Sequence, residues 1–225
     1  MSDTAGGELL RTAEARVLGA LVEKQLTTPD TYPLSLSALT AACNQSSNRH
    51  PVLHLDPSEV ERAVLDLKGR RLARVVHPGA GERVTKYRQV ADEALGLSPG
   101  ARAVLCILLL RGAQTVAELR ARTERLHRFA GTSEVEAALD DLARREPPLV
   151  ERVDRQTGRK EPRWIQLLEE GAARRAADLP AEGAGGGPGA GGAPALEQRV
   201  AALEARVAAL VEALGDLVDL DDVPS

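Results

Sequence analysis

The chain has 225 residues and a net charge of −4, and 43% of its residues are hydrophobic although only 2% are aromatic. Its core must therefore be built from Leu, Val and Ala, which favours two small helix-rich domains with appendages over a β-sandwich. The longest apolar run, residues 103–110, is far shorter than the ~20 residues that span a bilayer, and no signal peptide is evident. Two isolated cysteines, Cys43 and Cys106, make no disulfide framework, so we expect a cytoplasmic protein without membrane contact.

An internal repeat predicts the fold. Residues 58–67 and 133–142 both begin Ser-Glu-Val-Glu, follow a shorter amphipathic pattern, and precede two strands joined by a turn with Gly. Such self-similarity indicates one supersecondary unit used twice. Each unit contains three helices and a β-hairpin, which is the order of a winged helix-turn-helix. We predict an α+β fold, mainly α with small β-hairpins, in which tandem winged helix-turn-helix domains occupy residues 8–90 and 98–168.

The first unit opens with two helices around a proline-rich turn. Thr12 is the expected cap of the first helix, and Glu14 favours the positive end of its dipole. Apolar residues at helical spacing predict its buried face: Val17, Leu18, Leu21 and Val22. Residues 27–33 contain two prolines and cannot continue the helix, so they predict a turn into a short edge strand. Ser35 or Ser37 then starts the second helix.

A polar connector, residues 44–51, leads to the third helix. Asp56, with Glu59 three residues later, is typical of a capping box at a helix start. The buried stripe of this helix is Val60, Val64 and Leu67. Residues 75–77 and 84–87 flank a Gly-containing turn, and we expect them to form the first wing.

The second unit repeats this plan with shorter loops. Ser98 and Thr115 are the expected caps of its first two helices, and Ser133 with Glu136 predicts a capping box for the third. Its predicted wing strands are residues 149–153 and 163–167. The loops that are longer in the first unit, residues 28–33 and 44–54, are candidates for a specific function.

The tail predicts a linker and a coiled-coil helix. Residues 179–195 are almost wholly Gly, Ala and Pro, which is typical of a flexible linker. Residues 196–220 then carry a heptad seam, with Arg199 placed to pair with Glu204 of a second chain. The seam that we expect to form a homodimer is Leu196, Val200, Leu203, Val207, Leu210, Leu214 and Leu217. The alternative is that this helix packs on its own domains.

Polar residues of the first unit are the candidate binding site. The two units are mildly basic, +3 each, whereas residues 169–225 carry −7, so contact with nucleic acid is permitted. Connector groups able to bond phosphates or base edges belong to Asn44, Gln45, Ser46, Asn48 and Arg49. Basic residues of the first wing are Arg83, Lys86 and Arg88. The alternative is that the connector caps helices and the arginines pair with nearby surface acids.

Acidic third helices argue against the simplest mode of DNA binding. The half of this helix that normally enters the major groove carries Glu59 and Glu61 in the first unit. In the second unit the acids are Glu134, Glu136, Asp140 and Asp141. Phosphates repel such carboxylates. Two hypotheses therefore stand: a dimeric DNA-binding or transcription-associated protein, and a protein–protein adaptor that uses winged helices as a scaffold without binding DNA.

No catalytic constellation is evident, so we do not expect an enzyme, a cofactor or a small-molecule substrate. The four histidines lie in connectors, at the first wing or near a helix end. Cys43, His50 and His54 are near in sequence, but their spacing matches no standard zinc pattern, and we expect no metal. The glycines of the first wing lack the strand-to-helix context of a phosphate-binding loop.

A distinctive run covers residues 23–36, Glu-Lys-Gln-Leu-Thr-Thr-Pro-Asp-Thr-Tyr-Pro-Leu-Ser-Leu, and continues at 42–49 as Ala-Cys-Asn-Gln-Ser-Ser-Asn-Arg. It resembles the signature of the YceH family, a group of uncharacterised bacterial proteins. Residues 83–87 and 109–115 resemble two further blocks of that family. With the heptad tail, the resemblance covers nearly the whole chain. It implies a tandem winged-helix architecture, and it implies no activity or site residues.

Overall fold

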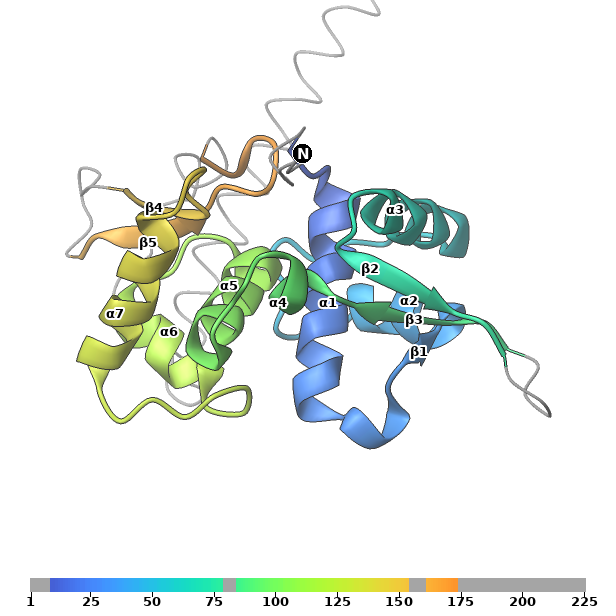
Figure 1. Ribbon diagram of the computed structural model, residues 1–225, viewed down its shortest axis with the longest axis horizontal. Helices are drawn as coiled ribbons and strands as arrows, with labels where there is room; N and C mark the ends of the chain where they lie inside the picture. Colours follow the sequence, from blue (N-terminus) through green and yellow to red (C-terminus); the bar gives the residue numbers. More distant parts are fainter. Residues whose placement is uncertain (1–8, 79–83, 154–160, 174–225) are drawn as a thin grey trace, which may run out of the picture. The chain divides into compact units, whose positions relative to one another are not determined.

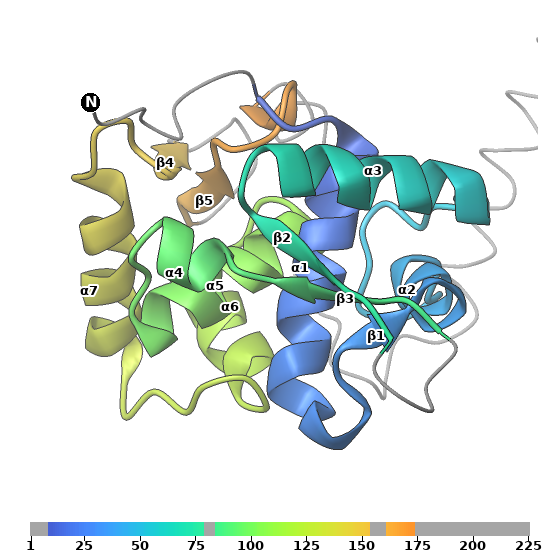
Figure 2. The same cartoon turned by 45° about the vertical axis from the view of Figure 1, so that its right-hand side comes forward.

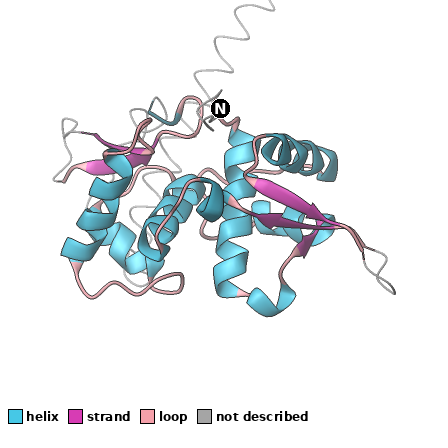
Figure 3. Ribbon diagram, in the orientation of Figure 1, coloured by secondary structure: helices cyan, strands magenta, loops and turns pink. Residues whose placement is uncertain are grey.

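The structure is a computed structural model that describes residues 9–78, 84–153 and 161–173 (Figure 1). The chain divides into two compact units, Met1–Ala181 and Glu182–Ser225, and every described residue belongs to the first. This part is mixed α and β, with seven α-helices and small antiparallel sheets (Figure 3). The predicted linker at 179–195 and the heptad helix at 196–220 lie outside the described residues.

The order of three helices and a hairpin occurs twice, as the repeat predicts. The first copy comprises α1 (Thr12–Thr27), η1 (Pro29–Thr31), β1 (Leu34–Ser35), α2 (Leu36–Cys43), α3 (Pro57–Gly69), β2 (Ala73–Val76) and β3 (Lys86–Gln89). A short helix, α4 (Ala91–Ala94), follows it. The second copy comprises α5 (Pro99–Arg111), α6 (Val116–Thr123), α7 (Thr132–Ala143), β4 (Val150–Val153) and β5 (Arg163–Gln166).

The small sheets correspond as well. The first copy has an antiparallel sheet of order β1-β3-β2, in which Leu34 pairs with Tyr87, so the predicted edge strand is confirmed. In the second copy, β4 and β5 pair, and an isolated bridge joins Gln114 to Trp164 in the place of β1. Tyr87 and Trp164 therefore occupy equivalent, buried positions in the two hairpins.

The N-cap residues agree with the sequence predictions at four helix starts and differ from them at two. Ser35, Asp56, Ser98 and Thr115 accept from the backbone N–H three residues later, as predicted. Thr12 instead lies inside α1, because the Arg11 N–H bonds the Glu14 carboxylate at 2.9 Å. The cap of α7 is Gly131, which makes no side-chain bond, so the predicted capping box at Ser133 is wrong. Glu134 reaches back to the N–H of Ala130 at 2.8 Å instead.

The two copies meet through their first helices. Helices α1 and α5 pack side by side (Figure 2). Most buried apolar residues of the two copies form one continuous core, and Ala113 and Ile165 form a small separate cluster. Gly19 permits the close approach, since a Cβ there would lie 2.9 Å from the Leu110 side chain. The Cys106 thiol donates to the Gly19 carbonyl at 3.5 Å. The copies are therefore two halves of one packed body.

Backbone bonds join the start of the first copy to the end of the second. The Leu10 N–H donates to the Leu168 carbonyl at 2.7 Å, and the Glu170 N–H donates to the Leu10 carbonyl at 2.9 Å. Among the described helices, none is both long and apolar enough to cross a membrane.

Candidate functional site

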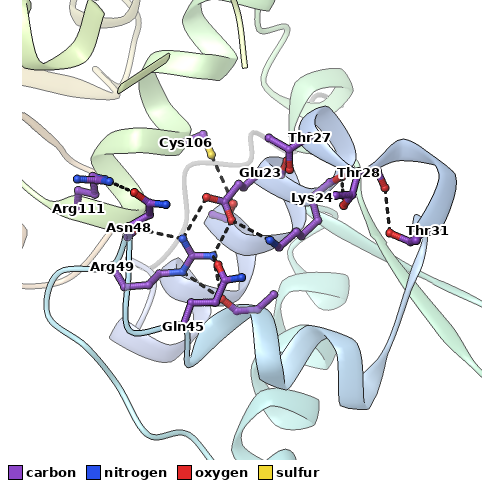
Figure 4. A network of polar contacts seen from close by, with 12 residues as sticks. Glu23, Lys24, Thr27, Thr28, Thr31, Gln45, Asn48, Arg49, Cys106 and Arg111 are labelled. Carbon is purple, nitrogen blue, oxygen red and sulfur yellow. Dashed lines mark hydrogen bonds and ion pairs between the residues drawn. The ribbon is translucent and has the colours of Figure 1, made fainter. Parts of the chain in front are cut away.

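The structure uses the connector after α2 as part of its interior. The Arg49 side chain is fully buried, and its two Nη atoms bond the two carboxylate oxygens of Glu23 on α1 at 3.1 and 2.6 Å (Figure 4). Its Nε and Nη2 also donate to the Ala42 carbonyl at 3.1 and 2.8 Å. A bidentate, charge-assisted pair of this kind is among the strong protein hydrogen bonds. Arg49 thereby joins the end of α2 to α1.

The connector amides are bonded within the chain too. The Asn44 side chain donates to the Leu55 carbonyl at 2.7 Å and accepts from the Leu55 N–H at 2.9 Å, which closes the connector like a strand pair. Gln45 Oε1 accepts from Arg49 at 2.9 Å. Asn48 has a left-handed backbone, φ 60°, and its side chain accepts from Arg111 of the second copy. A ligand at these amides would have to replace internal bonds.

A second buried arginine completes the arrangement. Arg16 of α1 donates to the Cys43 carbonyl at 3.0 Å and to the Pro51 carbonyl at 2.5 Å. Burial, and then the charge of Arg49, lower the pKa of Arg16. Together Arg16 and Arg49 satisfy the last two carbonyls of α2, which a helix leaves without intrahelical partners. These contacts support the helix-capping interpretation of the connector. Of its candidate residues, Ser46 and Asn48 are exposed.

The two thiols are buried. Burial raises the pKa of Cys43 to about 12, and it raises the pKa of Cys106 as well. Within residues 9–78, 84–153 and 161–173, no group of three or more His, Cys, Asp or Glu side chains could hold a metal ion.

Basic residues gather on one face of the first hairpin. Arg74 of β2 lies directly opposite Arg88 of β3, and Lys86 lies two residues before Arg88. Because side chains alternate along a strand, all three lie on the face opposite to buried Tyr87. We call Arg74, Lys86 and Arg88 the cationic face. Arg83, the other basic residue predicted for the first wing, lies outside the described residues.

Sequence reasoning found Lys86 and Arg88 but missed Arg74. The predicted strand began at residue 75, whereas β2 begins at Ala73 and includes Arg74. Alternation from the buried Ala73 would have placed Arg74 outward, so the signal was present in the sequence.

The second copy lacks this face. In its hairpin, Glu151 and Ile165 occupy the cross-strand positions of Arg74 and Arg88, and Ile165 is buried. Arg163 stands in the place of Lys86, and it donates to Glu118 and to the Ala113 carbonyl, both at 2.9 Å. Among the described residues, the cationic face is therefore a property of the first copy.

The third helices differ in what their acids do. In α3, the Glu59 carboxylate accepts from the Asp56 N–H at 2.8 Å within the capping box. Burial, and then the Glu61 carboxylate, raise the pKa of Tyr87, so Glu61 interacts with the hairpin. In α7, exposed acids line the outer face, and two of them pair within the helix or just after it: Asp140 with Arg144 and Asp141 with Arg145.

Fold and site together define an α+β protein of two joined copies, of which the first bears a cationic hairpin face. The family described as "Protein of unknown function, DUF480" matches residues 10–159. The chain therefore belongs to the DUF480/UPF0502 family of uncharacterised bacterial proteins.

Relatives in three bacteria are similar over most of the chain. The UPF0502 protein of Citrifermentans bemidjiense is 55% identical over 174 residues, which cover 76% of this chain and 80% of that protein. The UPF0502 protein of Geobacter sulfurreducens is 52% identical over 160 residues, covering 71% and 72%. That of Leptothrix cholodnii is 50% identical over 159 residues, covering 71% and 70%.

Proposed function

We propose that this chain is a DNA-binding protein built from two winged helix-turn-helix units, and that the cationic face contacts phosphates. The order of helix, short strand, two helices and hairpin in each copy supports the winged-helix assignment. The resemblance of residues 23–49 to the YceH family supports it further. In this proposal the protein is a binding protein without cofactor or catalytic role.

One observation carries the proposal: the cationic face differs between the copies where the fold does not. Arg74, Lys86 and Arg88 are spread over two neighbouring strands, and Glu93 pairs with the two arginines. Exposed arginines and lysines on a hairpin bond phosphate oxygens and release counterions, which gives affinity without reading sequence. If only the first copy contacts the phosphate backbone of DNA, basic residues are not required at the equivalent positions of the second copy.

The acids on α3 are compatible with this mode. Glu59 is engaged in its own capping box, and Glu61 interacts with Tyr87. Arg62 and Lys68 are exposed on the same helix. The hairpin, rather than the N-terminal half of α3, is therefore the proposed main contact. The connector has a supporting role, because Arg49 and Arg16 hold α2 against α1.

A salt-titrated binding assay on duplex DNA tests the proposal. Full-length wild type is compared with Arg74→Gln/Arg88→Gln, and with a matched control, Arg128→Gln/Arg144→Gln, which removes two exposed arginines of the second copy. Loss of two phosphate contacts should reduce the slope of log K against log salt by about 2. The control should leave the slope unchanged. The proposal is wrong if the wild type does not bind duplex DNA at low salt, or if the two double variants lose the same amount of affinity and salt slope.

A protein–protein adaptor is the second candidate, and one observation favours it. Leu65 is 47% exposed in the middle of the outer face of α3, between Arg62 and Lys68. An apolar side chain within a charged rim suits a protein interface better than phosphates. In an adaptor, Leu65→Ser should abolish capture of a defined partner that Arg74→Gln/Arg88→Gln still captures. The reverse pattern would favour nucleic acid.

We also propose that the heptad seam from Leu196 to Leu217 forms a parallel homodimer. Its residues lie outside those that the structure describes, so the support is the sequence pattern. Light scattering on the full chain and on a chain ending at Asp178 tests it: a dimer should become a monomer. A full chain that is already monomeric at micromolar concentration would contradict it.

A further inference from the structure

Two arginines face each other in the first hairpin at a position where like charges are unfavourable. Arg74 and Arg88 are direct cross-strand partners on an exposed face. Like charges directly opposite one another in an antiparallel pair destabilise it. An anion between or beside the two guanidinium groups therefore stabilises the pair.

Glu93 supplies that anion in the structure. Its Oε1 lies 3.2 Å from Arg88 Nη2, and its Oε2 lies 3.9 Å from Arg74 Nη2. One oxyanion is thus shared by two guanidinium groups, which is the arrangement by which arginines recognise phosphate.

The Glu93 carboxylate is held weakly although its backbone is held firmly. The side chains of Glu93, Arg74 and Arg88 are 62%, 64% and 37% exposed, and ion pairs at such exposed positions contribute little to stability. The backbone of α4 is anchored at its start, where the Gln89 side chain accepts from the Ala91 N–H at 2.6 Å. On the other side, Asp92 bonds Arg102 of α5 at 2.6 Å. Glu93 can therefore leave the arginines by a side-chain rotation alone.

We propose that Arg74 and Arg88 form a phosphate-binding subsite, and that the Glu93 carboxylate occupies it until a phosphate of duplex DNA displaces it. This inference rests on the proposed function and deepens it. Glu93 is then an internal competitor that lowers affinity for DNA. Lys86, two residues along β3, extends the cationic face toward the next phosphate.

The test is a salt-titrated duplex-binding assay with full-length Glu93→Gln. Removing the competitor should tighten binding at least about threefold at low salt and should steepen the salt slope by about 1. The matched control is Glu136→Gln, which makes the same charge change at an exposed position of α7. The gain should disappear in Glu93→Gln/Arg74→Gln, because the subsite has then lost one arginine. Thermal melts by circular dichroism verify that all variants are folded.

The outcomes separate this inference from the proposed function. If wild type binds DNA and Glu93→Gln binds no tighter than Glu136→Gln, the subsite is overturned while DNA binding stands. If no variant binds DNA at any salt concentration, the proposed function fails, and the subsite for nucleic acid fails with it. Tight binding of polyglutamate without binding of DNA would assign the two arginines to an acidic protein partner, which also overturns the proposal.

Discussion

Replacement of Arg49 by Met should show how strongly the connector is tied to α1. The substitution keeps an apolar stem of similar length but removes the guanidinium group. It leaves the Glu23 carboxylate without its bidentate partner and the Ala42 carbonyl without two donors. Removing one partner of a buried ion pair typically costs about 3–5 kcal/mol. Because the Glu23 side chain keeps 13% exposure and water can reach it, we expect the lower end, about 3 kcal/mol.

Urea and thermal unfolding measure this loss. At about 2–4 °C per kcal/mol for a body of this size, the melting temperature should fall by about 6–12 °C. Fluorescence of the single tryptophan, Trp164, reports on the second copy, and far-ultraviolet circular dichroism reports on both. The matched control is Arg144→Met at a 77% exposed position, where the change should stay within about 0.5 kcal/mol.

Two further variants make the reasoning refutable. Arg49→Lys keeps the positive charge but cannot make the bidentate contact with the Glu23 carboxylate. Its free energy of unfolding should therefore lie between those of wild type and Arg49→Met. In the double variant Arg49→Met/Glu23→Gln, the unpaired carboxylate is gone, and part of the stability should return. If Arg49→Met costs less than about 1 kcal/mol, the ion pair does not hold the connector in solution and the argument for a structural connector fails.

Three other outcomes follow from the structure. Gly19→Val should destabilise the fold by about 1–3 kcal/mol in urea melts, because its Cβ would lie 2.9 Å from the Leu110 side chain. Cys43 should resist thiol reagents at pH 8 and react only in denaturant, because burial raises its pKa to about 12. The pKa of Asp56 is lowered, first by its hydrogen bond from Ser58. The stability that the ionised Asp56 carboxylate contributes is therefore present above the ordinary carboxyl range and is lost as pH falls through the folded pKa. Asp56→Asn should make the free energy of unfolding less dependent on pH in this acid range.

Matched measurements decide these cases. Gly69→Val is the control for Gly19, since a Cβ at residue 69 meets no atom within 4 Å, and an equal loss would refute the close-approach argument. Labelling of Cys43 in the native protein as fast as in denaturant would contradict its burial. An unchanged acid limb in Asp56→Asn would show that other carboxyls cause it.

Local patterns predicted the parts of the fold that depend on neighbours in sequence. The stripe of Val60, Val64 and Leu67 is fully buried in α3, and Asp56 caps that helix, because periodicity and capping act within a few residues. The start of β2 lies two residues before the predicted one and its end one residue before, since strand ends depend on pairing with β3.

Long-range partners could not be predicted in the same way. Arg49 stands in a polar connector and looks like a surface residue, yet its partner Glu23 lies 26 residues earlier and the pair meets only after α1 and α2 pack. Nothing in the sequence around Gly19 indicates that α5 packs against this residue. Glu93, which pairs with Arg88 of the cationic face, lies on the short helix α4, and no sequence pattern predicted this helix.

The backbone bonds of Leu10 to Leu168 and Glu170 give the duplicated body a property that neither copy has alone. They bring its first and last described segments side by side, so the path of the chain closes on itself. With α1 already packed on α5, excising either copy would expose apolar surface of the other and remove the backbone partners at this bridge. We therefore expect that neither copy folds when the other is deleted, and that the two copies unfold together.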